Sequence, residues 1–268
     1  MLIDTHCHIN TMVKKTFDVP MTADELASAQ LIINEAAEQD VSPILNVGTS
    51  LIESENCIAL AKKYPTIYAA IGIHPNDLTP DWQSDLKKLA TYLPHKEELK
   101  IMAIGECGMD KHYPDYNILR QKDAFKVQIE LALEHDLAVV VHTRDAPEET
   151  LRCLEEYKTQ GLRGTIHCFS EDLSFAQTAI SWGFVLGIGG TITYPKNNEL
   201  RAVVRAVGIN NIILETDAPF LPPQIIRGKQ NHPKYIRAIA EYLADILTLS
   251  FEDVAETTRA NVKKIFRL

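Results

Sequence analysis

Short apolar runs rich in β-branched residues alternate along the chain with longer amphipathic segments. The short runs have the composition of strands that are buried on both faces of a parallel sheet. In the longer segments the apolar side chains recur at helical spacing, as Phe125, Ile129 and Leu133 do. The predicted strands are 2–5, 44–47, 67–73, 101–104, 138–141, 164–166, 184–188 and 212–214. The predicted helices are 23–39, 52–64, 81–93, 118–135, 147–157, 173–182, 199–207, 235–247 and 251–266.

Eight strand–helix units in a chain of 268 residues predict an α/β fold of the closed (β/α)8 type, a TIM barrel. No shift in composition marks a boundary, so we expect a single domain over residues 1–268. An open, doubly wound sheet is the alternative. It is less favoured because no glycine-rich phosphate-binding turn follows any predicted strand.

Composition and charge narrow the functional classes. The chain has 27 basic and 36 acidic residues, a net charge of −9, which disfavours binding of duplex DNA by bulk electrostatics. The five cysteines are dispersed and form no CxxC pair, as expected for reduced thiols in the cytoplasm. We find no signal peptide and no apolar run long enough to cross a membrane.

Histidines and carboxylates lie where six of the predicted strands end. In barrels of this type the active site forms at the carboxyl ends of the strands. His6 and His8 leave one strand on the same face, because side chains alternate along a strand. The others are His74, Glu106, His142, His167 and the pair Glu215 and Asp217. These residue types are ligands of divalent metals, so the pattern predicts a metal-dependent hydrolase site.

Several longer motifs give the chain a family likeness, and they run through almost its whole length. The chain resembles the TatD family of metal-dependent deoxyribonucleases, within the amidohydrolase-like barrels. The matching motifs are Asp4–His8, Gly72–Pro75, Gly105–Asp110, His142–Ala146, His167–Ser170, Glu215–Phe220 and Arg227–Pro233. One departure is the segment Asn10–Leu26, which is longer than is usual for the family and places Lys14 and Lys15 near the mouth of the site.

The resemblance implies a centre for one or two divalent ions, with Mg²⁺, Mn²⁺, Zn²⁺ and Ni²⁺ all acceptable to such ligands. It implies that one ion is held by His6, His8 and Asp217 and the other by His142 and His167. It also implies that Glu106 bridges them.

The expected reaction is hydrolysis of a phosphodiester bond in DNA, at single strands or ends, with a metal-activated water as nucleophile. Glu106 and Asp217 are the candidate catalytic carboxylates, and Asp217 is the expected base. The candidate substrate contacts are His74, Arg144, Arg227, Lys229 and Asn231. The last three follow the eighth strand, where barrels commonly bind phosphate. Gly187, Gly189 and Gly190 are expected to keep one side of the pocket open.

Two other functions stay open at this point. The same metal site can act on a small amide, ester or lactone, although the run Arg227–Asn231 argues for phosphate. A barrel that serves only as an interaction module predicts gaps in the ligand set, and the sequence has none. We expect no obligate protein partner and no membrane association.

Overall fold

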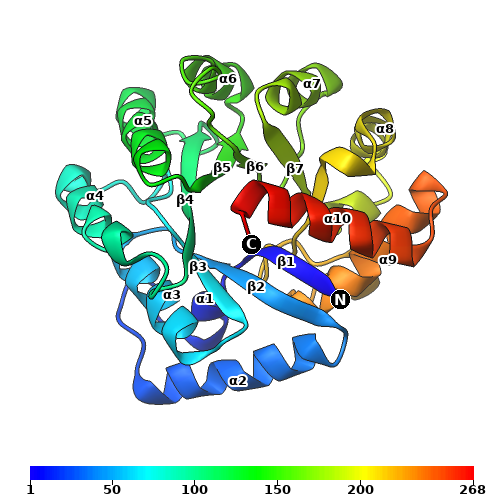
Figure 1. The fold of residues 1–268 in the computed structure, drawn as a ribbon, viewed down its shortest axis with the longest axis horizontal. Helices are drawn as coiled ribbons and strands as arrows, with labels where there is room; N and C mark the ends of the chain where they lie inside the picture. The colour runs from blue at the N-terminus through cyan, green and yellow to red at the C-terminus, as the bar shows by residue number, and fades with distance from the viewer.

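Eight parallel strands form one sheet that curves into a barrel, and helices surround it (Figure 1). The computed structural model describes residues 1–268. The strands are β1 (Leu2–Cys7), β2 (Val41–Val47), β3 (Ile67–Ile71), β4 (Ile101–Asp110), β5 (Ala138–Arg144), β6 (Gly164–Ile166), β7 (Phe184–Ile188) and β8 (Ile212–Leu214).

The helices follow the strands in turn. They are α1 (Ile9–Val13), α2 (Ala23–Ala37), α3 (Leu51–Lys63), α4 (Trp82–Ala90), α5 (Ile118–Glu134), α6 (Pro147–Glu155), α7 (Leu173–Ser181), α8 (Asn198–Val207), α9 (Ile236–Leu247) and α10 (Phe251–Phe266). None of them is long and apolar enough to cross a membrane.

The strands pair in chain order, and the last strand meets the first. Beyond β8, Ala218 forms a parallel bridge with Cys7, and its carbonyl accepts a hydrogen bond of 2.7 Å from the His8 amide. The predicted (β/α)8 barrel is therefore confirmed, and the open sheet is wrong. Three strands run further at their carboxyl ends than predicted: β1 continues to Cys7, β4 to Asp110 and β5 to Arg144. Strand β2 begins earlier than predicted, at Val41.

Buried apolar side chains form two separate clusters. The larger cluster lies mainly between the barrel and its helices. It includes Val139 and Val141, which lie on the outer face of β5. The smaller one fills the barrel interior and includes Val140, Ile3 and Ile213. Alternate residues of one strand thus serve different clusters, which is why the β5 sequence is apolar without interruption.

Helix α10 closes the amino end of the barrel. Val262, Ile265 and Phe266 belong to the interior cluster, and Figure 1 shows α10 lying across the ring of strands on the side where both chain ends lie. Ser250 and Asp253 form a capping box that fixes the start of this helix. With this end closed by α10, the carboxyl ends of the strands are the open face of the barrel.

We expect Phe266→Ala to lower the free energy of unfolding by about 3 kcal/mol, because it empties a packed apolar site. Phe266 is 6% exposed and lies at the end of the barrel opposite the carboxyl ends of the strands. Denaturant unfolding measures this loss, and Leu119→Ala is the control, since Leu119 is 71% exposed. Equal stability of the two variants would show that α10 does not support the barrel.

Candidate metal centre

An open cavity of about 680 Å³ lies over the carboxyl ends of the strands. Its floor is formed by strand-end side chains from β1, β4, β5 and the segments after β6 and β8. Those predicted from the sequence that line it are His8, His74, Glu106, His142, Arg144, His167 and Asp217. His6 lies just beneath them and is fully buried.

The buried carboxylate of Glu106 lies at the centre of the imidazole cluster. Its Oε1 lies 2.9 Å from Nδ1 of His142 and 3.1 Å from Nε2 of His167. Its Oε2 lies 3.3 Å from Nε2 of His6 and 3.9 Å from Nε2 of His8. The two oxygens of one side chain thus face two different pairs of rings.

The carboxylate of Asp217 lies beside the two imidazoles that β1 supplies, those of His6 and His8. Its Oδ1 lies 3.3 Å from Nε2 of His8 and 3.7 Å from Nε2 of His6, and these two nitrogens are 3.1 Å apart. The backbone holds the group in place: the Asp217 amide donates to the His6 carbonyl at 2.8 Å. Nδ1 of His8 donates to the Val47 carbonyl at 2.8 Å, which leaves Nε2 to face the centre.

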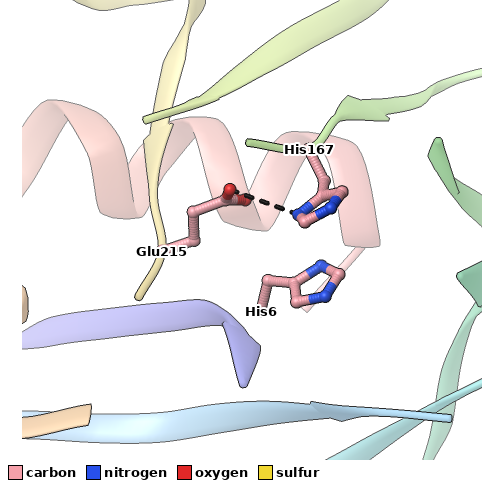
Figure 2. Close-up of side chains that lie close together, drawn as sticks. All are labelled: His6, His167 and Glu215. Atoms are coloured by element: carbon pink, nitrogen blue, oxygen red, sulfur yellow. Dashed lines mark ion pairs between the residues drawn. The ribbon is translucent and has the colours of Figure 1, made fainter. Parts of the chain in front are cut away.

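Two further carboxylates orient the imidazoles from behind. Asp110 Oδ2 lies 3.1 Å from Nε2 of His142, so Nδ1 of that ring is the nitrogen that faces Glu106. Glu215 lies 3.4 Å from Nδ1 of His167 and leaves its Nε2 facing the centre. Figure 2 shows the Glu215 carboxylate pointing toward this ring. Carboxylates in this position fix the orientation and raise the basicity of histidines that bind metals.

The His167 ring also stacks on the His6 ring, with centroids 3.8 Å apart and planes 18° from parallel (Figure 2). The two imidazoles therefore present their Nε2 atoms side by side toward the same carboxylate. This arrangement joins β1 to the end of β6 across the barrel interior.

The buried carboxylates of the centre are kept ionised by the imidazoles beside them. Burial by itself raises the pKa of Glu106, but His167, His142 and His6 outweigh it and hold that pKa well below its ordinary value. Burial likewise raises the pKa of Asp217, but the hydrogen bond from His8 and the charges of His167 and His6 together outweigh it and lower that pKa. Both carboxylates are therefore ionised at neutral pH, and their negative charge favours a cation between the rings.

The donor set fits a divalent metal ion. His6 Nε2, His8 Nε2 and Glu106 form one group of ligand atoms that lie within 4.8 Å of one another, and Glu106, His142 and His167 form another. Imidazole nitrogens and carboxylate oxygens that converge in this way repel each other unless protons or a cation lie between them. A divalent ion satisfies all of these lone pairs at once.

The sequence also matches a family model. The family described as TatD related DNase matches residues 3–267. The chain belongs to the TatD family. Because the match spans almost all of the residues, it includes every strand end that contributes to the cavity.

Two relatives of this TatD-family protein are both described as metal-dependent hydrolases. It is 32% identical to the uncharacterized metal-dependent hydrolase YabD of Bacillus subtilis, over the full length of both chains. It is also 32% identical to the uncharacterized metal-dependent hydrolase YcfH of Escherichia coli, over all of this chain and 96% of the relative. The crystal structure of the TatD homolog YjjV from Escherichia coli superposes with a TM-score of 0.88 at 27% identity, covering 100% of this chain and 98% of the other. The TatD-family protein is thus a metal-dependent hydrolase.

A phosphotriesterase from Mycobacterium tuberculosis shares the fold. It superposes with a TM-score of 0.68 at 14% identity, covering 99% of this chain and 93% of the other. At this identity the likeness concerns the barrel architecture alone.

The predicted substrate contacts divide into two groups. His74 and Arg144 line the cavity, and Nε2 of His74 lies 3.6 Å from Glu106 Oε1. Arg227 and Lys229 are exposed but do not line the cavity, and the Arg227 guanidinium lies over the Tyr194 ring at 3.9 Å.

The prediction that Asn231 contacts a substrate is wrong. Its side chain is 1% exposed, and its Nδ2 donates to the carbonyls of Thr216, Phe220 and Leu221. Its Oδ1 accepts from the His232 amide, so both ends of the amide are occupied by the backbone. Asn231 therefore holds the segment that carries Asp217 in place.

The glycines in and after β7 do not open the pocket as predicted. A Cβ atom at Gly187 would lie 2.2 Å from Oε2 of Glu215, so this glycine makes room for that buried carboxylate. A Cβ atom at Gly190 would lie 2.5 Å from the Leu221 carbonyl. The space that these residues leave is filled by neighbouring parts of the protein.

Sequence reasoning missed Asp110 and undervalued Glu215 as residues of the centre. The signal for Asp110 is its spacing: Glu106 and Asp110 are four residues apart, so both point to the same face if the strand continues. The predicted strand ended at 104, which removed this argument. Glu215 was recognised as a strand-end carboxylate, but not as the partner of His167.

We expect Asp110→Asn to weaken divalent metal binding about 10- to 100-fold, because His142 loses the carboxylate that orients it. Competition with a metal indicator measures the affinity. Asp115→Asn is the matched control, since Asp115 is an exposed carboxylate in the same connection. If both variants bind metal like the parent protein, Asp110 does not support the centre.

Metal binding should release protons and strengthen as the pH rises. Burial lowers the pKa of His8, His142 and His167, but the adjacent carboxylates outweigh it and raise all three pKa values in the metal-free protein. A protonated imidazole cannot be a ligand, so affinity increases as the pH passes upward through these raised values. Calorimetric titration in two buffers of different ionisation enthalpy counts the released protons, and a buffer-independent enthalpy contradicts the expectation.

Proposed function

We propose that this TatD-family protein is a divalent-metal-dependent phosphodiesterase that cleaves DNA at single strands or ends. The observation that carries the proposal is the position of Glu106, whose carboxylate belongs to two groups of ligand atoms at the floor of one open cavity. Two-metal sites with a shared ligand are common among enzymes that hydrolyse phosphodiesters. The family description supports DNA as the substrate.

In this proposal His6, His8 and Asp217 would hold one ion, His142 and His167 would hold the other, and Glu106 would contribute to both sites. A bound divalent ion supplies Lewis-acid chemistry: it makes water more acidic and offsets negative charge on the substrate oxygens. Mg²⁺, Mn²⁺, Zn²⁺ and Ni²⁺ remain candidates, because mixed imidazole and carboxylate ligands accept them all.

The protein's own groups orient the reactants and move the proton. Asp217 is ionised and partly accessible from the cavity, so it can accept the proton of the attacking water. The water would attack phosphorus in line with the leaving oxygen, whose bond to phosphorus breaks as the new P–O bond forms. Arg144 is exposed at the cavity wall, where its guanidinium can pair with a phosphate of the substrate.

His74 is a neutral hydrogen-bond donor in this scheme. Burial, together with the neighbouring His142, lowers its pKa to about 3, so it carries no charge at neutral pH. Its Nδ1 accepts from the Asn76 amide at 3.1 Å, which places the remaining proton on Nε2. Nε2 faces Glu106 and the cavity, where it can donate to a substrate oxygen.

We expect Asp217→Asn to lower kcat about 10²- to 10⁴-fold at saturating metal, because the reaction loses its base. Binding of a phosphorothioate oligonucleotide, measured by fluorescence anisotropy, should change much less. Asp115→Asn again serves as the control for loss of one negative charge. A variant that keeps the parental rate would show that Asp217 is not the base.

The substrate class needs a direct comparison. End-labelled single-stranded and duplex oligonucleotides are assayed beside a panel of esters, lactones and amides, each with Mg²⁺, Mn²⁺, Zn²⁺ or Ni²⁺. The proposal predicts metal-dependent cleavage of the single strand. Turnover of esters, lactones or amides with no cleavage of any oligonucleotide would favour the alternative small-molecule hydrolase.

A further inference from the structure

Three exposed aromatic side chains line the cavity that holds the candidate metal centre. They are Phe17, Tyr113 and Phe220, which are 51%, 50% and 52% exposed. They come from three separate connections: Phe17 lies between α1 and α2, Tyr113 between β4 and α5, and Phe220 after β8. Burying rings of this size stabilises a protein, so three half-exposed rings around one cavity suggest contact with a ligand.

The segment that carries Phe17 is fixed by buried polar contacts. Glu53, which is 1% exposed, accepts from the Lys14 ammonium at 2.5 Å and from the Asp18 amide at 2.7 Å. The Lys14 ammonium also donates to the Val19 carbonyl at 2.6 Å, and the Ser50 hydroxyl donates to Asp18 at 2.6 Å. The backbone is thus held on both sides of Phe17, while about half of the Phe17 surface stays exposed.

This network also occupies the ammonium group of Lys14, which the sequence analysis placed near the mouth of the site. The Lys14 side chain is only 2% exposed, so it cannot reach a phosphate. Among the residues that line the cavity, Arg144 is the single lysine or arginine. With a net charge of −9 for the whole chain, contacts to phosphates alone supply little affinity for a nucleic acid.

The rings stand on different sides of the centre. Phe220 packs against His8, with ring centroids 6.0 Å apart, so a base on its free face would lie close to the candidate metal centre. Phe17 follows β1, which meets β8 at the closure of the barrel, and therefore belongs to the same side. Tyr113 follows β4 and packs edge-on against His112, with centroids 5.3 Å apart, on the opposite side.

We propose that Phe17 and Phe220, with Tyr113 across the cavity, form stacking platforms for unpaired nucleobases on either side of the phosphate that is cleaved. This inference rests on the proposed nuclease function and adds the source of its substrate affinity. Aromatic platforms bind single strands with little sequence preference, because every base offers a π-face. Bases inside a duplex are already stacked and paired, so the platforms favour single strands and frayed ends.

The test compares a thymidine oligonucleotide with an abasic oligonucleotide of the same length and backbone. Phe17→Leu removes the ring and Phe17→Tyr keeps it, while both retain a large side chain. Tyr116→Leu is the matched control, since Tyr116 is 43% exposed in the same connection as Tyr113 but does not line the cavity. Initial rates with Mn²⁺ give kcat and KM for each pair.

For the thymidine substrate we expect Phe17→Leu to raise KM about tenfold with kcat within about twofold, the order expected for loss of one base–aromatic stack. Phe17→Tyr and Tyr116→Leu should behave like the parent. For the abasic substrate all four proteins should have the same KM.

Three results would overturn the inference. One is an unchanged KM of Phe17→Leu for thymidine, and another is an equal rise for both substrates, which would indicate a general disturbance of the loop. In both cases the parent still cleaves DNA, so the nuclease proposal survives. If the parent protein cleaves neither oligonucleotide, the proposed function fails and the inference fails with it.

Discussion

The buried carboxylate of Glu106, surrounded by imidazoles from three other strand ends, is the interaction on which the rest of the site depends. An ionised carboxylate in a protein interior is unfavourable unless charged partners compensate it. His6, His142 and His167 all approach it within 3.3 Å, and each ring is oriented by its own strand. The barrel meets this requirement, because only a closed ring of parallel strands brings β1, β4, β5 and the end of β6 to one point.

Local structure around the centre serves the same purpose. Asp110 and Glu215 fix two of the rings, and the Val47 carbonyl fixes a third. Gly187 leaves the space in which Glu215 lies. Asn231 holds the segment that carries Asp217. These residues contact no substrate in the proposed reaction, yet each one determines where a ligand atom lies, which is what a metal site requires of its surroundings.

Much of the barrel, and the gathering of histidines and carboxylates at its carboxyl end, could be predicted from the sequence, because both depend on local patterns. The division of these residues between two ions stays a prediction. Alternation along β1 places His6 and His8 on one face, and the fold rule places strand ends together. The predicted end of β4, at residue 104, was wrong for a physical reason. A glycine usually weakens a strand, but β4 continues through Gly108. The backbone φ at Gly108 is +149°, and a Cβ atom there would lie 1.9 Å from the carbonyl oxygen of His142, so only a glycine fits at this position of the strand. Contacts between segments that are far apart in the sequence, such as Lys14 with Glu53 of α3 or Asn231 with the Thr216 carbonyl, leave no local signal at all.

The sharing of Glu106 between two metal ions, as proposed above, is tested by anomalous diffraction from crystals soaked in Mn²⁺. We expect two peaks about 3.5–4 Å apart, one on each side of the Glu106 carboxylate. One peak should lie beside His6, His8 and Asp217, and the other beside His142 and His167. A single peak out of reach of Glu106, or no peak at the strand ends at saturating Mn²⁺, would contradict it.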